Sequence, residues 1–186
     1  SEDNLLKPSS PYSASKAGAD LLVKSWKFTY NLPILISRCS NNYGPFQNKE
    51  KLIPKTIYSC INKKNIPIYG NGKQIREWIF VEDHVDAVLH LLQFGKIGET
   101  YNIGSNNEIE NIKLVKKICS IYKKLSKSSY DYKLLIKFVK DRPGHDFRYA
   151  LNTKKIKKIG WKSKFKFEKS LSDTISWYID SYKNET

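Results

Sequence analysis

The chain has 186 residues, of which 40% are hydrophobic and 13% aromatic, a composition that excludes disorder along its whole length. Its net charge of +15 comes mostly from lysines spread along the chain, without an arginine-rich arm or a basic–aromatic repeat. This pattern does not indicate a nucleic-acid partner, whereas a phosphate-bearing small ligand remains compatible with it. The sequence has no apolar run of the about 20 residues that cross a bilayer, so we expect no membrane partner.

The cysteines indicate the cellular compartment of the protein, and the opening residues indicate whether the sequence is a fragment. Cys39, Cys60 and Cys119 lie far apart without the spacing of a metal site, so we interpret them as reduced, buried thiols and expect no metal. Such thiols, without a secretory leader, predict a cytoplasmic protein. The sequence contains no methionine and opens on SEDNLLKPSSP, which is loop-like. We therefore expect a fragment of a longer protein.

The first predicted element is a helix from Pro11 to about Asn31. Ser10 is a suitable N-cap, and Pro11 suits the first helical position. Apolar residues continue one face of this helix at steps of four, at Leu22, Trp26 and Tyr30.

Short apolar segments then alternate with helical periods. Strands are predicted at 32–37, 66–70, 75–81, 100–104 and 134–140. The first of these, LPILIS, is typical of a strand buried on both faces of a parallel sheet. Helices are predicted at 52–64, 82–95, 112–122, shortly before Gly160, and from about 168 to 182, with a polar loop at 41–51. The alternation predicts an α/β fold with mainly parallel strands.

Tyr12 and Lys16 stand four residues apart and therefore share one face of the first helix. A phenol is a poor base at neutral pH, but a nearby ammonium group favours the phenolate. The pair could accept a proton from a hydroxyl group while hydride leaves the same carbon. The small neighbours Ser13 and Ala14 would let a flat cofactor ring approach. The spacing alone fits ordinary helix packing equally well.

Longer stretches carry a resemblance to a known family. PYSASKAGAD, residues 11–20, is similar to the active-site helix of the extended short-chain dehydrogenase/reductase family, whose members act on nucleotide sugars with bound NAD. RCSNNYGPFQNKEKLIPK, IPIYGNGKQIREWIFVEDH, YNIGSNNEIEN and DRPGHDFRYALN match that family in order. NNYGP…KLIPK together with DRPGHD resembles most the dehydratases of this family that act on dTDP-glucose. The resemblance covers nearly the whole chain from about Ser9.

The resemblance implies the C-terminal part of a Rossmann-like NAD-binding fold with a smaller α/β lobe for the sugar nucleotide. Rossmann elements are then expected at about 9–42 and 80–104, and the substrate-binding lobe at about 43–79 and 105–186. The glycine-rich NAD fingerprint is not in this sequence, because GNGKQ is a turn between strands and does not open a helix. The adenine half of the NAD site is therefore expected outside this chain.

The activity implied by the resemblance is a lyase reaction, the dehydration of dTDP-glucose to dTDP-4-keto-6-deoxyglucose with NAD, on the way to dTDP-rhamnose and polysaccharide. Tyr12 would take the proton of the C4 hydroxyl, and Lys16 would assist it and hold the nicotinamide ribose. The acidic pair for the C5 proton and the C6 hydroxyl would precede Ser1, because Glu2 and Asp3 lie too close to Tyr12 and are interpreted as solvated loop charges. We expect the isolated chain to be inactive and the intact enzyme to be a homodimer through the tyrosine helix.

The remaining site residues also follow from the resemblance. It places Asn41 on the substrate and Asn42 near the cofactor, at the end of a strand, where α/β proteins bind ligands. Arg76 and Arg142 suit the diphosphate because the guanidinium fork binds phosphate in a bidentate manner. His145 lies beside the DRPG turn, which contains Arg142. The other substrate-binding candidates are Lys51, Leu52, Pro67, Ile68, Tyr69, Asn111, Asp141, Pro143 and Gly144. Taken singly, each fits a turn, a surface or a core residue.

Two alternatives stay open. Other nucleotide-sugar dehydratases or epimerases, acting on GDP-mannose, CDP-glucose or UDP-sugars, share parts of the pattern. A non-catalytic remnant that binds a nucleotide sugar or a partner subunit is the second. Turnover of the different nucleotide sugars by the full-length protein would distinguish these hypotheses.

Overall fold

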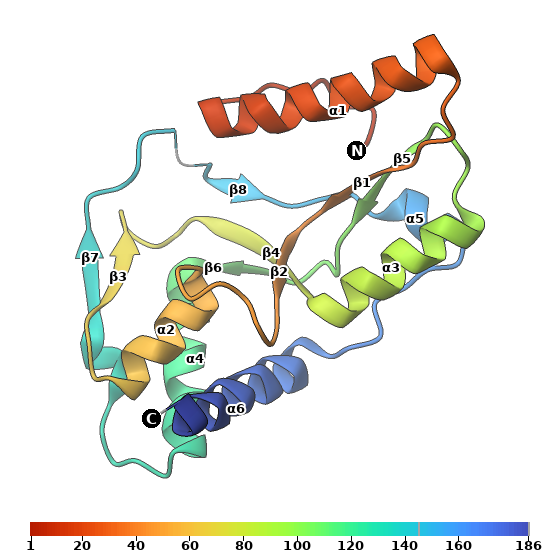
Figure 1. Ribbon diagram of the computed structural model, residues 1–186. Helices are drawn as coiled ribbons and strands as arrows, with labels where there is room; N and C mark the ends of the chain where they lie inside the picture. Colours follow the sequence, from red (N-terminus) through yellow and green to blue (C-terminus); the bar gives the residue numbers. More distant parts are fainter. Residues whose placement is uncertain (145, 186) are drawn as a thin grey trace.

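The computed structural model describes residues 1–144 and 146–185, in which helices and strands alternate along the chain (Figure 1). The helices are α1 (Pro11–Tyr30), α2 (Leu52–Ile61), α3 (Val81–Phe94), α4 (Asn111–Leu125), the 3-10 helix η1 (Tyr132–Leu135), α5 (Lys154–Lys158) and α6 (Phe167–Glu185). The strands are β1 (Ile36–Cys39), β2 (Asn41–Tyr43), β3 (Ile66–Tyr69), β4 (Ile75–Phe80), β5 (Thr100–Ile103), β6 (Glu108–Glu110), β7 (Ile136–Val139) and β8 (Arg148–Tyr149).

Strand pairing is mainly parallel, as the sequence predicts. The parallel pairs are β1–β5, β2–β4, β3–β7 and β4–β8, whereas β4 and β6 are antiparallel. The central strand β4 thus pairs with β2, β6 and β8. The prediction of an α/β fold is confirmed.

Two hydrophobic clusters form the core, and β4 contributes to both. Because side chains alternate along a strand, Trp78 and Phe80 join the first cluster and Ile79 joins the second. The first cluster packs α2, α4 and α6 around β3, with fully buried residues such as Ile57 and Leu171. The second joins α3, β5 and α5.

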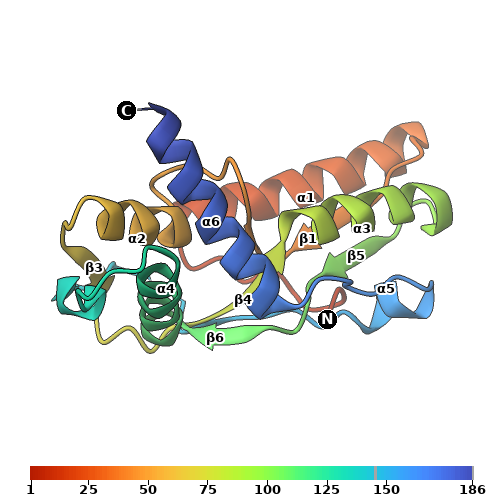
Figure 2. The same cartoon turned by 90° about the horizontal axis from the view of Figure 1, so that it is seen from below.

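Helix α1 begins and ends as the sequence predicts. Ser13 donates its N–H to Ser10 Oγ (3.2 Å), and Ser10 donates its N–H to Ser13 Oγ (2.9 Å), which completes a capping box. The helix ends at Asn31 in the left-handed region (φ 53°). None of its residues is buried. In Figure 2, α1 and α3 lie on one side of the β1–β5 pair, and α5 lies on the other.

Several predicted boundaries are wrong. The strand predicted at 32–37 begins only at Ile36, because the chain turns before it, where the N–H of Ile34 donates to Leu32 O (3.0 Å). Strand β1 is not buried on both faces either, since Ile36 is its one buried residue. The predicted loop at 41–51 contains β2, and β6 and β8 were not predicted. These strands have only two or three residues, too few to show a period of two.

Candidate functional site

Tyr12 and Lys16 lie in the first turns of α1, where both side chains are exposed. The Tyr12 side chain is 74% exposed, so its hydroxyl is available to a ligand. The capping box fixes where this helix starts and therefore fixes the direction in which the two side chains leave it. The pair has the same-face geometry that the spacing predicts.

The loop that contains DRPG lies against the start of this helix. Ser9, just before α1, donates its hydroxyl to Asp146 Oδ1 (3.4 Å). A Cβ added to Gly144 would lie 3.2 Å from Ser9 O. This proximity brings the DRPG loop and β8 beside the helix that carries Tyr12 (Figure 1).

Two guanidinium groups and an aromatic ring meet beside this loop. The Arg142 guanidinium lies 4.7 Å from the centre of the Tyr69 ring. The half-buried Arg76 donates to Ile75 O (2.8 Å) and to Asp146 O (2.7 Å). Burial lowers the pKa of Arg76 from its ordinary value, while the carboxylate of Asp146 acts against this and the charge of Arg142 adds to it. A diphosphate would give both guanidinium groups an anionic partner.

Gln74 joins two further candidates to the same cluster. Its side-chain amide donates to Asp141 Oδ2 (2.8 Å), and its main-chain oxygen accepts from the N–H of Asn111 (3.0 Å). Asn111 Oδ1 is buried and has no hydrogen-bond partner among the described residues, so it can accept from a ligand. Sequence reasoning missed Gln74, although it lies inside one of the family-like stretches.

Asn41 and Asn42 point to opposite faces of β2, because successive residues of a strand alternate. The side-chain amide of Asn42 donates to Cys39 Sγ (3.4 Å), while its Oδ1 is buried without a partner in the described part of the chain. A ligand donor beside β2 would satisfy this oxygen. Together with the accessible face of Tyr12 and Lys16, this is compatible with the nicotinamide side of NAD.

Other predicted residues lie in the core, in a paired strand or on the exposed surface. Ile68 is 2% exposed and packs in the first hydrophobic cluster, so its side chain is a core residue. Pro67, in the same strand, pairs with Lys137. Leu52 opens α2 and packs against the same cluster, and the exposed Lys51 precedes it. His145 lies outside the described residues, and Pro143 is exposed.

Tyr149 is a second residue that sequence reasoning missed. Its hydroxyl donates to Cys39 O (3.0 Å), at the end of β1. Burial raises the pKa of Tyr149, with smaller contributions from neighbours that include Tyr12. Tyr149 therefore lies within electrostatic reach of Tyr12. The signal was its place in DRPGHDFRYALN, the stretch that resembles the family.

The predictions for Glu2 and for one of the cysteines are wrong. Glu2 was interpreted as a solvated loop charge, but it is half-buried and its Oε1 accepts from the N–H of Asn102 (2.9 Å). Cys60 and Cys119 are buried free thiols, as predicted, whereas Cys39 is only half-buried.

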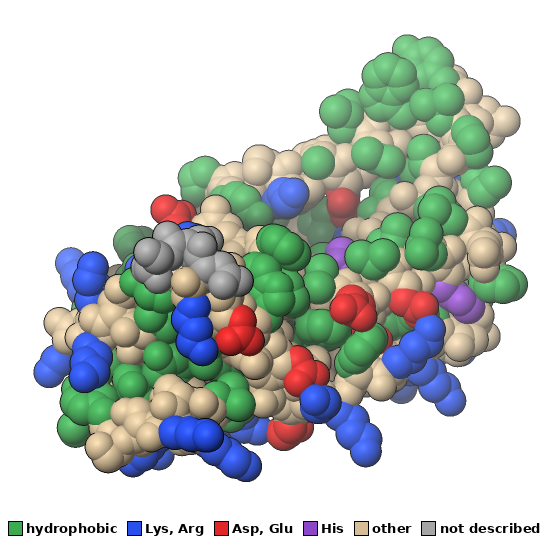
Figure 3. Space-filling model, turned by 60° about the horizontal axis from the view of Figure 1, so that its bottom comes forward, with side chains coloured by type: hydrophobic (Ala, Val, Ile, Leu, Met, Phe, Trp, Pro, Cys, Tyr) green, Lys and Arg blue, Asp and Glu red, His purple; other side chains and the backbone are tan. Residues whose placement is uncertain are grey.

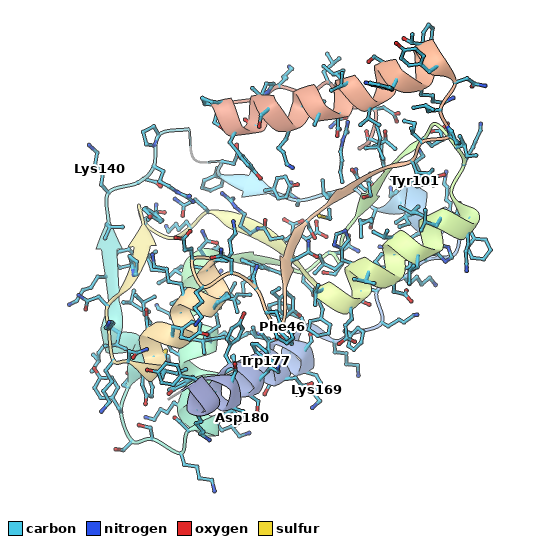
Figure 4. The ribbon with its side chains drawn as sticks, in the orientation of Figure 1. Phe46, Tyr101, Lys140, Lys169, Trp177 and Asp180 are labelled. Atoms are coloured by element: carbon cyan, nitrogen blue, oxygen red, sulfur yellow. The ribbon has the colours of Figure 1, made fainter. Side chains whose placement is uncertain are left out.

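A hollow of about 490 Å³ lies away from these residues. It is bounded by the loop before α2, by α2 and by α6. Phe46 and Trp177 both line this hollow, with ring centres 4.6 Å apart. Figure 4 labels the two side chains, which lie next to each other. The hollow contains none of the predicted site residues. Among the described residues, no helix is long and apolar enough to cross a membrane, and no cluster of three potential metal ligands occurs.

Comparison with known proteins adds independent findings. The family model for GDP-mannose 4,6 dehydratase matches residues 1–174. The chain is 50% identical over 179 residues to dTDP-glucose 4,6-dehydratase of Neisseria gonorrhoeae, covering 94% of this chain and 52% of that protein. It is 49% identical over 185 residues to the enzyme of that name from Escherichia coli, covering 97% and 51%. The chain thus spans about half the length of the curated relatives it matches.

Solved structures give the same picture. The crystal structure of dTDP-glucose 4,6-dehydratase from Bacillus anthracis in complex with NAD matches with a TM-score of 0.88 and 42% identity, over 98% of this chain and 56% of that one. The structure of the Streptomyces venezuelae dTDP-glucose 4,6-dehydratase, with NAD bound, matches with a TM-score of 0.90 and 37% identity, over 98% and 55%.

Proposed function

The chain belongs to the GDP-mannose 4,6 dehydratase family, and we propose that it forms the C-terminal half of an NAD-dependent dTDP-glucose 4,6-dehydratase. The proposed reaction is that of a lyase, which removes water from dTDP-glucose to give the 4-keto-6-deoxy sugar. Identity of about half of all residues to relatives of that name supports this substrate over GDP-mannose. The free thiols of the three cysteines are compatible with a cytoplasmic enzyme.

The observation that carries the proposal is the contact between the DRPG loop and the start of α1. Ser9 and Asp146 join these segments, while Arg76 donates to the main chain of Asp146. An anion held by Arg76 and Arg142 would therefore lie on the side of the molecule where α1 begins. This is the arrangement that a nucleotide sugar needs, with its diphosphate on the cations and its sugar toward Tyr12.

Each residue then has a chemical role. Tyr12 accepts the proton of the C4 hydroxyl, and the ammonium of Lys16 on the same face favours the phenolate that does so. NAD, when bound, takes up the hydride from C4 and returns it at C6. Asn42 and Lys16 would hold its nicotinamide side, and Tyr69 would stack against the base. Among the other predicted residues, we assign Asn41, Lys51, Leu52, Pro67, Asn111 and Asp141 to the substrate.

We also propose the division into Rossmann elements (about 9–42 and 80–104) and a substrate lobe (about 43–79 and 105–186). The two hydrophobic clusters support this division in most of their residues. The exceptions include Ile79, Ile156 and Trp161, which pack with the Rossmann elements, and Phe80, which packs with the substrate lobe. The isolated chain should be inactive, because the resemblance places the acidic pair and the adenine half of the NAD site outside it.

The experiment that tests this function uses the full-length protein that contains this chain. It is incubated separately with dTDP-glucose, GDP-mannose, CDP-glucose and UDP-glucose, and the products are identified by mass spectrometry. We expect loss of one water from dTDP-glucose, with slower turnover of the others. Preference for GDP-mannose would reassign the substrate within the family. Binding without turnover of any of them would favour a non-catalytic protein.

Replacing Arg76 by lysine should weaken substrate binding. The change keeps the charge but removes the fork that contacts phosphate, so we expect the KM for dTDP-glucose to rise about tenfold to a hundredfold. Arg148→Lys is the matched control, because Arg148 is exposed and its fork binds Glu108 (2.7 Å). Equal effects of both variants on KM would contradict the diphosphate role.

Exposed apolar residues on α1 support a homodimer. Leu21 and Leu22 are each 60% exposed and Phe28 is 96% exposed. Figure 3 shows hydrophobic side chains gathered on the projecting end of the molecule, where α1 ends. We expect Leu22→Asp to shift the full-length protein from dimer toward monomer, measured by sedimentation at several concentrations. Leu134→Asp, at an exposed leucine of η1, should leave the mass unchanged. A monomeric parent protein would contradict the assembly.

A further inference from the structure

We infer that Glu77 is a positioning residue for the substrate site, an inference that rests on the proposed function. Glu77 lies in β4 beside Arg76 and is 1% exposed. Its two carboxylate oxygens accept from the main chain of two separate segments. The N–H of Asn106 donates to Oε1 (2.8 Å), and the N–H of Leu151 donates to Oε2 (2.8 Å).

This environment requires a carboxylate. A buried charge persists only where hydrogen bonds compensate for lost water, and here two N–H groups do so. A glutamine at this position could accept with one oxygen, but its NH₂ group would face the other N–H. The close fit extends to Gly104, where an added Cβ would collide with Oε1 of Glu77.

The two segments that Glu77 holds lead to the proposed substrate residues. Asn106 lies in the connection between β5 and β6, which continues to Asn111 at the start of α4. Its backbone is in the left-handed region (φ 62°), which costs free energy for a non-glycine residue, so a hydrogen bond to its N–H helps to hold it there. Leu151 follows β8, at the end of the segment that carries Asp141 and Arg142. Two segments of the proposed site therefore meet at the Glu77 carboxylate, and Arg76 precedes it in β4.

All described residues of the segment from 141 to 149 are exposed, so hydrogen bonds hold it and not a buried face. Beside the bonds of Gln74 and Arg76, the N–H of Ile75 donates to Phe147 O (2.8 Å), Arg148 donates to Glu108 (2.7 Å) and the Tyr149 hydroxyl donates to Cys39 O (3.0 Å). Where this segment ends, Glu77 supplies a side-chain anchor from β4, and Asn102 donates to Asn152 O (3.2 Å). Loss of the Glu77 anchor should therefore shift the proposed cation site while leaving the hydrophobic clusters in place.

The test is Glu77→Gln in the full-length protein. We expect the KM for dTDP-glucose to rise about tenfold, the effect of losing one hydrogen bond to a charged group, while kcat changes less than about threefold. Tyr12 and Lys16 lie on α1, which Glu77 does not contact through any hydrogen bond in the described part of the chain. Glu168→Gln is the control, because Glu168 is an exposed carboxylate on α6 and should leave both constants unchanged.

A second variant and a second measurement test the role of Glu77 independently of the Glu77→Gln result. Gly104→Ala keeps the Glu77 charge but displaces the carboxylate, and it should raise KM in the same way. Hydrogen exchange of the peptides that contain Asn106 and Leu151 should be faster in both variants. Unchanged exchange there, or a loss of kcat equal to the rise in KM, would overturn the inference. So would failure of both variants to fold, because the role would then be that of a general core residue.

These readouts separate the inference from the proposed function. If the parent protein neither binds nor converts dTDP-glucose, the function fails, and the exchange data alone then decide whether Glu77 anchors the two segments. If the parent is active and folded Glu77→Gln retains its KM, the positioning role fails while the function stands.

Discussion

Tyr12→Phe in the full-length protein should lower kcat by about 10²- to 10⁴-fold, the range for removal of a general base. The substitution keeps the ring and removes only the phenolic oxygen proposed to accept the proton of the C4 hydroxyl. Because the Tyr12 side chain is 74% exposed, the melting temperature should not change. The measurement is the rate of product formation with ordinary and C4-deuterated dTDP-glucose, together with a thermal melt.

Tyr30→Phe provides the matched control for this experiment. Tyr30 ends the same helix and is 64% exposed, so the same loss of a hydroxyl there should leave kcat unchanged. A near-normal rate for folded Tyr12→Phe would show that the Tyr12–Lys16 spacing serves helix packing and not catalysis.

Asp83→Ala should produce the largest loss of stability, about 3 kcal/mol in the free energy of unfolding. Asp83 is 1% exposed in the first turn of α3 and accepts three hydrogen bonds from the segment before α6. The donors are Ser163 Oγ (2.6 Å), Lys164 N (2.8 Å) and Phe165 N (3.3 Å). Alanine leaves all three without this acceptor in the protein interior. The measurement is urea denaturation followed by tryptophan fluorescence.

Asp173→Ala makes the same substitution at an exposed position. Asp173 pairs with Lys169 on the surface of α6 (2.8 Å), and such pairs contribute little, so we expect a change of less than about 0.5 kcal/mol. An equally small loss for Asp83→Ala would mean that its buried hydrogen bonds contribute little to stability.

The sequence predicted the elements whose signal is local. Ser10, Pro11 and the apolar period place α1 correctly, because a capping box and a proline at the first helical position depend only on neighbours in the chain. The helix 82–95 was predicted to end at Gly95, and α3 does end directly before it. Among the site candidates, Arg76, Arg142 and Tyr69 lie together as the matched motifs suggested.

Features that depend on tertiary contacts could not be predicted from the sequence. Strand β8 exists because two residues pair with β4, and nothing in Arg148–Tyr149 alone indicates a strand. Gln74 and Glu77 looked like turn and strand residues, since their partners are 67 and 74 residues away in the chain. Ile68 was assigned to the ligand by resemblance, but whether a side chain of a short strand faces a core or a pocket depends on what packs against it.

The absence of buried side chains from α1 has a consequence for how easily this helix opens. A helix of 20 residues without a packed face is only marginally stable by itself, and its ties to the rest of the molecule include the Asp20–Arg38 ion pair (2.6 Å). Helix α1 therefore opens at a lower free-energy cost than the two hydrophobic clusters, which can form without it. Tyr12 and Lys16 thus lie on the element whose amide hydrogens we expect to exchange first, ahead of those in α2, α4 and α6.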